Sequence, residues 1–152
     1  MPQSLSKLFV HLVFHIKNQK ITIGKEVKPD LYAYMGTVIK DNGSIPIIII
    51  NGTYDHVHIL CVISKTITVA KLVEEIKRNS SRWIKTLGNQ YKGFAWQGGY
   101  AAFSVSPSLH DKTRDYIMNQ EKHHKKMTFK EELVLFLKEY GIDYNEKFLW
   151  DD

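Results

Sequence analysis

The chain has 152 residues, enough for one domain with a sizeable core, and its hydrophobic fraction of 43% excludes a largely disordered protein. A formal net charge of +5 is compatible with an anionic partner but does not require one. The single cysteine, Cys61, excludes an internal disulfide and a multi-cysteine zinc site, and neither a signal peptide nor a membrane-spanning run is apparent, so we expect a soluble protein of a reducing compartment.

The first half of the chain predicts a strand, a helix and a β-hairpin. Apolar residues fill one alternating set of residues 8–16, and the other set combines Phe9 and Val13 with His11 and His15, which predicts a strand buried largely on both sides. Pro29 suits the first turn of a helix that the Asn-Gly pair 42–43 would end. The β-branched run 45–50 predicts a second strand, and the Asn-Gly pair 51–52 is a turn signal before a third. These two strands should form an antiparallel hairpin.

A long helix and a fourth strand should follow. Thr68 can cap a helix whose apolar stripe extends to Leu87, with Gly88 just beyond it. Residues 94–106 are rich in glycine and aromatic residues, and they predict a loop followed by a strand over 100–105.

Two helices and a tail should end the chain. Ser108, with Asp111 three residues on, resembles a capping arrangement for a helix that begins near Leu109 and continues through Gln120. A capping box at Thr128 predicts the last helix. The tail contains apolar residues that would be costly to leave in water, so we expect it to dock on this chain or on another subunit; these residues are Phe148, Leu149 and Trp150.

The order of these elements predicts an α+β fold with helices packed against a sheet. Residues 1–152 should form a single domain, because the sequence contains no repeats and no low-complexity linkers. Residues 127–152 would be a C-terminal helix and tail that contact DNA or a second subunit.

His56 and His58 lie two residues apart in the third predicted strand. Side chains alternate along a strand, so both imidazoles should lie on one face while Val57 and Ile59 lie on the other. Such a pair can bind a metal ion, but two structural histidines are about as frequent an explanation for so short a motif. His11, in the first strand, is expected to pack or form hydrogen bonds.

Tyr116 and Gln120 lie four residues apart on a predicted helix and should share one face of it. A tyrosine hydroxyl can act as a nucleophile in phosphoryl transfer. The Gln120 carbonyl oxygen could join His56 and His58 as a ligand of Mg²⁺ or Mn²⁺. Without these neighbours, Tyr116 would be interpreted as an ordinary packing residue.

Several motifs together resemble one family. Residues 55–60 resemble the histidine-hydrophobic-histidine motif of HUH nucleases, and residues 116–120 resemble the tyrosine helix of the single-tyrosine HUH transposases of small bacterial insertion sequences. Weaker matches occur at residues 10–14, 77–83 and 96–105, in the family's order. One departure is the Asn-Gly-Thr-Tyr stretch before Asp55, where relatives often carry a small residue and proline.

The resemblance implies an RRM-like (ferredoxin-like) antiparallel sheet with flanking helices. It also implies a metal-dependent enzyme that cleaves and rejoins single-stranded DNA at insertion-sequence ends through a 5′-phosphotyrosine on Tyr116. Expected partners are DNA hairpins and a second copy of the chain, whose histidine pair would receive the tyrosine helix. Neither a nucleotide cofactor nor a membrane is expected, and the setting would be the cytoplasm of a bacterium or archaeon. Alternatives are a nickase of the replication-initiator or relaxase kind and a domesticated hairpin-DNA binder or repressor.

Further residues are candidates for DNA contact. A basic stripe on the second helix would meet phosphates, although a solvated helix face is the default explanation; it comprises Lys71, Arg78, Arg82 and Lys85. Trp96 could stack on unpaired bases because glycines follow it closely. Lys125 lies in the tract 123–126, which we interpret mainly as the basic end of a helix that could also touch DNA near Tyr116.

Overall fold

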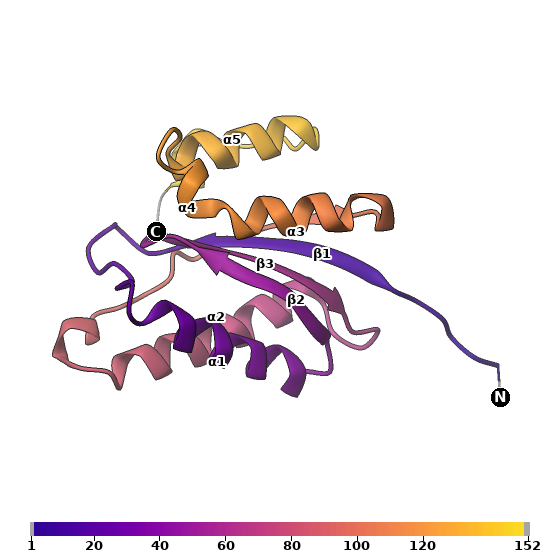
Figure 1. Ribbon diagram of the computed structural model, residues 1–152, viewed down its shortest axis with the longest axis horizontal. Coiled ribbons are helices and arrows are strands. Elements are labelled where there is room, and N and C mark those ends of the chain that lie inside the picture. The colour runs from indigo at the N-terminus through magenta and orange to yellow at the C-terminus, as the bar shows by residue number, and fades with distance from the viewer. Residues whose placement is uncertain (1, 151–152) are drawn as a thin grey trace.

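A four-stranded antiparallel sheet forms the centre of the molecule (Figure 1). The computed structural model describes residues 2–150, and the side chains of residues 45–48 and 148 lie outside that description. The strand order is β2–β3–β1–β4, with β1 at Leu8–His15, β2 at Ile45–Gly52, β3 at His56–Ile63 and β4 at Ala101–Val105. This arrangement confirms the predicted α+β class.

Two long helices cover one face of the sheet, which we name the core face. They are α1 (Lys28–Asp41) and α2 (Val69–Lys85), and both lie below the sheet in Figure 1. The Thr68 side chain accepts a hydrogen bond from the Lys71 amide and so caps α2 as predicted. The buried side chains between these helices and the sheet include Leu12, Phe14, Leu31, Met35, Ile39, Val57, Ile59, Cys61, Leu72, Val73 and Ile76.

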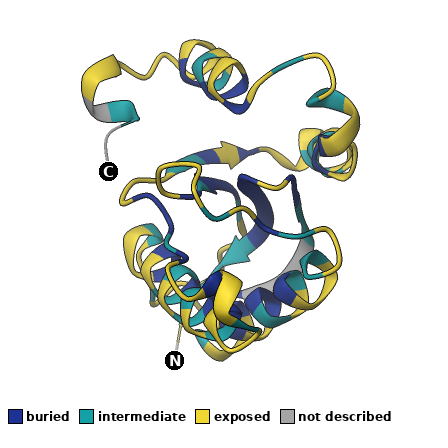
Figure 2. Cartoon of the chain, turned by 90° about the vertical axis from the view of Figure 1, so that its left-hand side faces the viewer, coloured by how far each residue is buried: buried dark blue, intermediate teal, exposed yellow. Residues whose placement is uncertain are grey.

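The opposite face, which we name the histidine face, carries the C-terminal helices α3 (His110–Met118), α4 (Gln120–His123) and α5 (Phe129–Glu139) (Figure 1). Thr128 caps α5 as predicted, because its side chain accepts from the Glu131 amide. Short helical turns occupy η1 (Asn89–Tyr91), η2 (Pro107–Leu109) and α6 (Glu146–Leu149). The buried residues are concentrated in the layer of the strands, and most outward helix faces are exposed (Figure 2).

Strand register decides which residues share the histidine face. In the antiparallel β1–β3 pair, Val13 lies opposite His58 and His15 lies opposite His56. Paired residues point to the same side, so β1 places His11 and Val13 on the face that carries both β3 histidines. The alternation predicted from sequence is therefore confirmed.

The predicted hairpin turn at residues 51–52 is wrong. Asn51 and Gly52 belong to β2 and pair with His58 and Val57, and the connection to β3 consists of residues 53–55. A Cβ atom at Gly52 would lie 2.1 Å from the His56 carbonyl oxygen. The glycine is needed for the close approach of the two strands.

The single helix predicted from Leu109 through Gln120 is also wrong, because it is interrupted at Asn119 (φ −98°, ψ 24°). The start of α3 differs as well: neither Ser108 nor Asp111 forms the expected side-chain cap in the described structure, and the preceding turn is η2. Leu87, expected in the apolar stripe of α2, is 42% exposed because α2 ends at Lys85.

The tail packs on its own chain. Leu149 and Trp150 are partly buried against the apolar cluster beneath α5, while the expected burial of Phe148 falls on a side chain outside the described residues. In the described part of the chain, no helix is both long and apolar enough to cross a membrane.

Candidate active site

His56 and His58 lie side by side on β3 and are both fully buried. His56 Nδ1 lies 2.7 Å from Asp55 Oδ1, and His58 Nδ1 lies 2.7 Å from His11 Nε2. These contacts engage the Nδ1 side of each ring, so both Nε2 atoms are directed toward the helices above the sheet. A partner that fixes one ring nitrogen is typical of histidines that bind an ion through the other.

The helices bring Gln120 and Tyr116 to this pair. Gln120 is fully buried, and its Oε1 lies 3.0 Å from His56 Nε2. The Tyr116 ring lies 6.1 Å from the His58 ring between centroids. All four predicted site residues therefore meet within one chain, and the interruption at Asn119 lies between the two that the helices supply.

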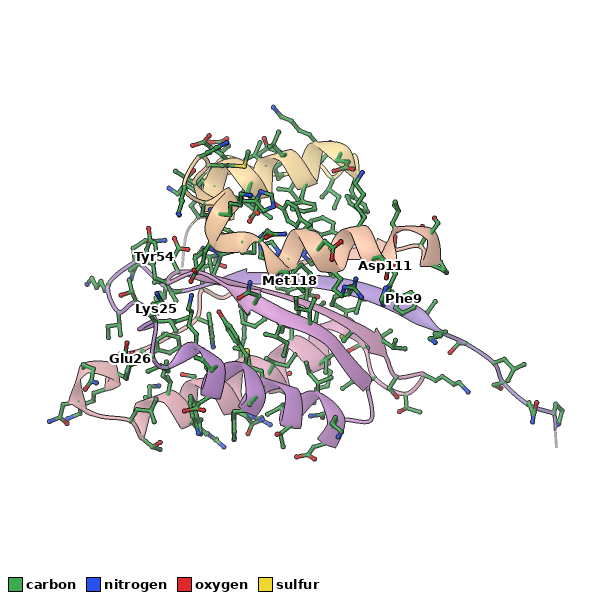
Figure 3. All side chains as sticks on the ribbon, viewed as in Figure 1. Phe9, Lys25, Glu26, Tyr54, Asp111 and Met118 are labelled. Atoms are coloured by element: carbon green, nitrogen blue, oxygen red, sulfur yellow. The ribbon has the colours of Figure 1, made fainter. Side chains whose placement is uncertain are left out.

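Asn51 fixes the end of α3. Its Nδ2 donates to the Ile117 carbonyl at 2.9 Å and to the Met118 carbonyl at 3.0 Å. Carbonyls at a helix C-terminus need partners from outside the helix, and Asn51 serves two of them. Figure 3 labels Met118 at this end of α3 and Asp111 at the other, above the sheet. The departure from the family motif thus supports the helix that carries Tyr116.

Glu132, a residue that sequence reasoning missed, lies at the centre of the site. It projects from α5, is 2% exposed, and places Oε1 2.9 Å from His58 Nε2. Its Oε2 accepts hydrogen bonds from the Tyr116 hydroxyl and from Gln120 Nε2. The available signal was the helical spacing, since position 132 falls within the predicted apolar stripe that contains Phe129 and Phe136.

His124 joins the same cluster, although the tract 123–126 was interpreted mainly as a basic helix end. Its Nε2 lies 3.1 Å from both Gln120 Oε1 and Glu132 Oε1. His123 instead stacks on the Tyr116 ring, with centroids 4.7 Å apart. Two neighbours in sequence therefore serve different parts of the site.

The titratable groups form a buried charged network. Burial alone would lower the pKa of His56, but hydrogen bonds with Asp55 and Glu132 raise it to about 9. Burial lowers the pKa of His58 to about 4 despite Glu132. Burial opposes ionisation of Glu132, yet hydrogen bonds from the histidines hold its pKa far below the usual value. Burial, followed by the Glu132 charge, raises the pKa of Tyr116.

A pocket of about 600 Å³ opens beside Tyr116. Two lysines, Lys122 and Lys126, line it together with two acidic residues, Glu132 and Glu139. At the far end of α4, Lys25 and Tyr54 line a smaller pocket with His124, and Figure 3 labels both in loops there. The first pocket therefore combines basic and acidic side chains beside the tyrosine.

The other residues predicted to contact DNA differ in their exposure to solvent. Trp96 is 8% exposed, packs on Phe14 and Phe94, and donates from Nε1 to Ser80 Oγ at 3.0 Å. The idea that its ring stacks on bases is therefore wrong. Lys125 is exposed near the site.

The basic stripe lies on α2, across the sheet from the histidine face (Figure 1). All four of its members are exposed, namely Lys71, Arg78, Arg82 and Lys85. Glu75 lies 2.6 Å from Arg78 and 3.1 Å from Lys71, which neutralises part of the stripe. Any phosphate held there would lie on the other side of the sheet from Tyr116.

The donor set fits a divalent ion. One potential ligand atom from each of His56, His58 and Glu132 lies within 4.8 Å of the others, and all three residues are buried. The Gln120 oxygen lies against the same His56 nitrogen. Two imidazoles with carboxylate and amide oxygens can hold Mg²⁺ or Mn²⁺.

Comparisons with known proteins concern the fold and the family of the chain. A structure of a protein described as a transposase, from Deinococcus radiodurans R1, superposes with a TM-score of 0.61 at 22% identity, covering 79% of this chain and 95% of that one. A REP-associated tyrosine transposase bound to a REP hairpin gives 0.60 at 15% identity, covering 82% and 73%. No curated protein matches the chain. The family model described as "Transposase IS200 like" matches residues 4–120. The chain belongs to the IS200-like transposase family.

Proposed function

We propose that this protein cleaves and rejoins single-stranded DNA at the ends of an insertion sequence through a covalent 5′-phosphotyrosine on Tyr116. The observation that carries the proposal is the position of the Tyr116 ring beside a buried His56–His58 pair, within a member of a transposase family. The site residues in this account are Tyr116 as nucleophile and His56, His58 and Gln120 as ligands.

The reaction needs no external energy source. The Tyr116 oxygen attacks the scissile phosphorus, the bond from phosphorus to the 3′ oxygen breaks, and that oxygen leaves with a proton as a 3′-hydroxyl. A second 3′-hydroxyl then attacks the phosphotyrosine and releases Tyr116, which joins the strands. Mg²⁺ or Mn²⁺ held by His56, His58 and Gln120 would supply charge stabilisation at the phosphate oxygens. Asn51 holds α3 in place so that Tyr116 faces the site.

The substrate would be a single strand with a hairpin near the cleavage site. The similar REP-associated transposase is bound to a hairpin, and this supports a hairpin ligand for the present chain. The cleaved strand would approach Tyr116 through the pocket lined by Lys122 and Lys126. The stripe on α2 remains a predicted contact for more distant DNA.

We propose one domain over residues 1–152 and a homodimer that brings two DNA ends together. Tyr116 lies beside the histidine pair of its own chain, so the site can be assembled in cis. The expectation that the tyrosine helix serves the partner stays a prediction, and so does a bacterial or archaeal cytoplasmic setting. Full activity at a dilution where only monomer is present would contradict a shared site.

The test is a labelled hairpin-bearing single strand incubated with Mn²⁺ and resolved under denaturing conditions. Wild-type protein should retain the label as a covalent adduct, Tyr116→Phe should not, and the control Tyr100→Phe, which alters an exposed tyrosine, should match the wild type. His58→Ala should lose the adduct while it keeps most hairpin binding. Hairpin binding without an adduct in the wild type would contradict the proposal and favour a DNA-binding repressor.

A further inference from the structure

Glu132 is a buried carboxylate on the inward face of α5, where its neighbours Phe129 and Leu133 are apolar. Carboxylates are rarely this buried unless they are paired or bind a metal, because desolvating the charge is costly. α5 is also firmly anchored, since Thr128 caps it and its apolar residues pack on Val13 and Phe103. The helix therefore holds the carboxylate in place.

The two carboxylate oxygens have separate partners. Oε1 faces imidazole nitrogens: it lies 2.9 Å from His58 Nε2, 3.4 Å from His56 Nε2 and 3.1 Å from His124 Nε2. Oε2 faces the nucleophile, because it accepts from the Tyr116 hydroxyl and from Gln120 Nε2. One side chain thus links the histidine pair to the tyrosine.

The spacing of the donors matches a coordination shell. Ligands about 2.1 Å from an octahedral Mg²⁺ or Mn²⁺ lie about 3 Å apart when adjacent. The separations from His56 Nε2 to Gln120 Oε1 (3.0 Å) and from His58 Nε2 to Glu132 Oε1 (2.9 Å) have this length. Small shifts would place these four donors around one ion.

Charge favours the same role. His56, His58 and Gln120 are neutral as ligands, so by themselves they leave two positive charges of a buried ion without compensation. Mg²⁺ and Mn²⁺ are hard ions that prefer carboxylate oxygens, and Glu132 supplies one carboxylate at this position.

We propose that Glu132 is a ligand of the catalytic ion through Oε1 and that it orients Tyr116 through Oε2. The assignment rests on the proposed function, because it concerns the same ion. α5 begins at Phe129, beyond the matched segment 4–120, so a helix outside the family match supplies this ligand. Glu132 would couple ion binding to the position of the nucleophile.

The test measures Mn²⁺ binding to the full-length, DNA-free protein by titration calorimetry. Glu132→Gln keeps the shape but removes the charge, and it should weaken Mn²⁺ binding by at least about tenfold, the loss typical of disturbing even an outer-shell partner. Glu132→Asp keeps the charge on a shorter side chain and should fall in between. The control Glu131→Gln alters the exposed neighbour and should bind as the wild type does. Circular dichroism verifies that each variant is folded.

Wild-type Mn²⁺ affinity in folded Glu132→Gln and Glu132→Asp would overturn the proposal. If these variants keep the wild-type Mn²⁺ affinity and also form the DNA adduct faster than the wild type, Glu132 occupies the place of the scissile phosphate in the DNA-free protein. That result would overturn the proposal as well. The two proposals fail separately. If affinity depends on Glu132 but no DNA adduct forms, the ligand assignment stands and the proposed function fails; an adduct with Glu132-independent affinity gives the reverse.

Discussion

Replacing Asn51 by alanine should weaken the fold and the reaction together. The change removes two hydrogen bonds, to the Ile117 and Met118 carbonyls at 2.9 and 3.0 Å. Each such bond contributes about 0.5–1.5 kcal/mol, and water can reach this partly exposed position, so we expect a loss of about 1–2 kcal/mol in the free energy of unfolding. Asn51→Asp should cost more, because a carboxylate would face two carbonyls at a helix C-terminus.

The effect on the reaction should exceed the effect on stability. Ile117 follows the nucleophile directly, and a displacement of about 1 Å at a reacting group can lower a rate by about 100-fold. Adduct formation at saturating DNA should therefore slow in Asn51→Ala even under conditions where the protein is fully folded. Urea denaturation gives the first quantity, and a time course on denaturing gels gives the second.

A matched control exists on the opposite side of the sheet. Asn42 Nδ2 donates to the Val38 carbonyl at 2.9 Å near the end of α1, so Asn42→Ala removes a bond of the same kind far from the site. It should lower stability without slowing adduct formation. The reasoning is refuted if Asn51→Ala matches the wild type in both measurements, or if Asn42→Ala slows the adduct equally.

Three further results are expected. Replacing Lys122 and Lys126 by glutamine should weaken single-stranded DNA binding and reduce its salt dependence more than replacing Arg78 and Arg82 does, because only the two lysines line the pocket at Tyr116. Equal effects of the two double replacements in a filter-binding assay would contradict an approach of the DNA through this pocket. Trp96→Phe should lower the free energy of unfolding by about 1–2 kcal/mol, because the hydrogen bond to Ser80 is lost, and it should leave DNA affinity unchanged. Weaker DNA binding at an unaltered free energy of unfolding would instead indicate that Trp96 stacks on DNA bases. Burial lowers the pKa of Lys77 from 10.5 to about 8, so between pH 8 and pH 10.5 the unfolded chain binds more protons than the folded one. The free energy of unfolding of the wild type should therefore rise with pH in this range relative to that of Lys77→Met. Urea midpoints that change with pH in the same way for both proteins would refute the shift.

Local patterns in the sequence predicted most of the sheet and the helices. Alternation on β3 assigned His56 and His58 to one face, and Thr68 and Thr128 marked the starts of α2 and α5. These features depend on residues that are close together in the chain, so they can be predicted from short stretches of sequence.

The failures share a long-range cause. The pair 51–52 reads as a turn, but it continues β2 because Gly52 allows close contact with β3. The interruption at Asn119 coincides with bonds from Asn51, more than 60 residues away. Trp96 is buried because Ser80 and Phe14, both distant in sequence, lie beside it. Contacts between residues that are far apart in the chain cannot be predicted from short stretches of its sequence.

Glu132 illustrates the same limit within the site. Its helix was predicted, and its position in the apolar stripe was visible in the sequence, but its role depends on how α5 docks over His58. His56, His58, Tyr116 and Gln120 were selected because a motif spacing and a resemblance singled them out. No such spacing links Glu132 to the histidine pair.

Mass spectrometry of the digested protein–DNA adduct tests the central claim most directly. Trypsin should release residues 115–122, a peptide in which Tyr116 is the only tyrosine. After nuclease trimming, we expect a 5′-linked nucleotide on this peptide at Tyr116, present with Mn²⁺ and absent from His58→Ala. A nucleotide on any other peptide, or on this peptide in His58→Ala at the wild-type yield, would contradict the proposed mechanism.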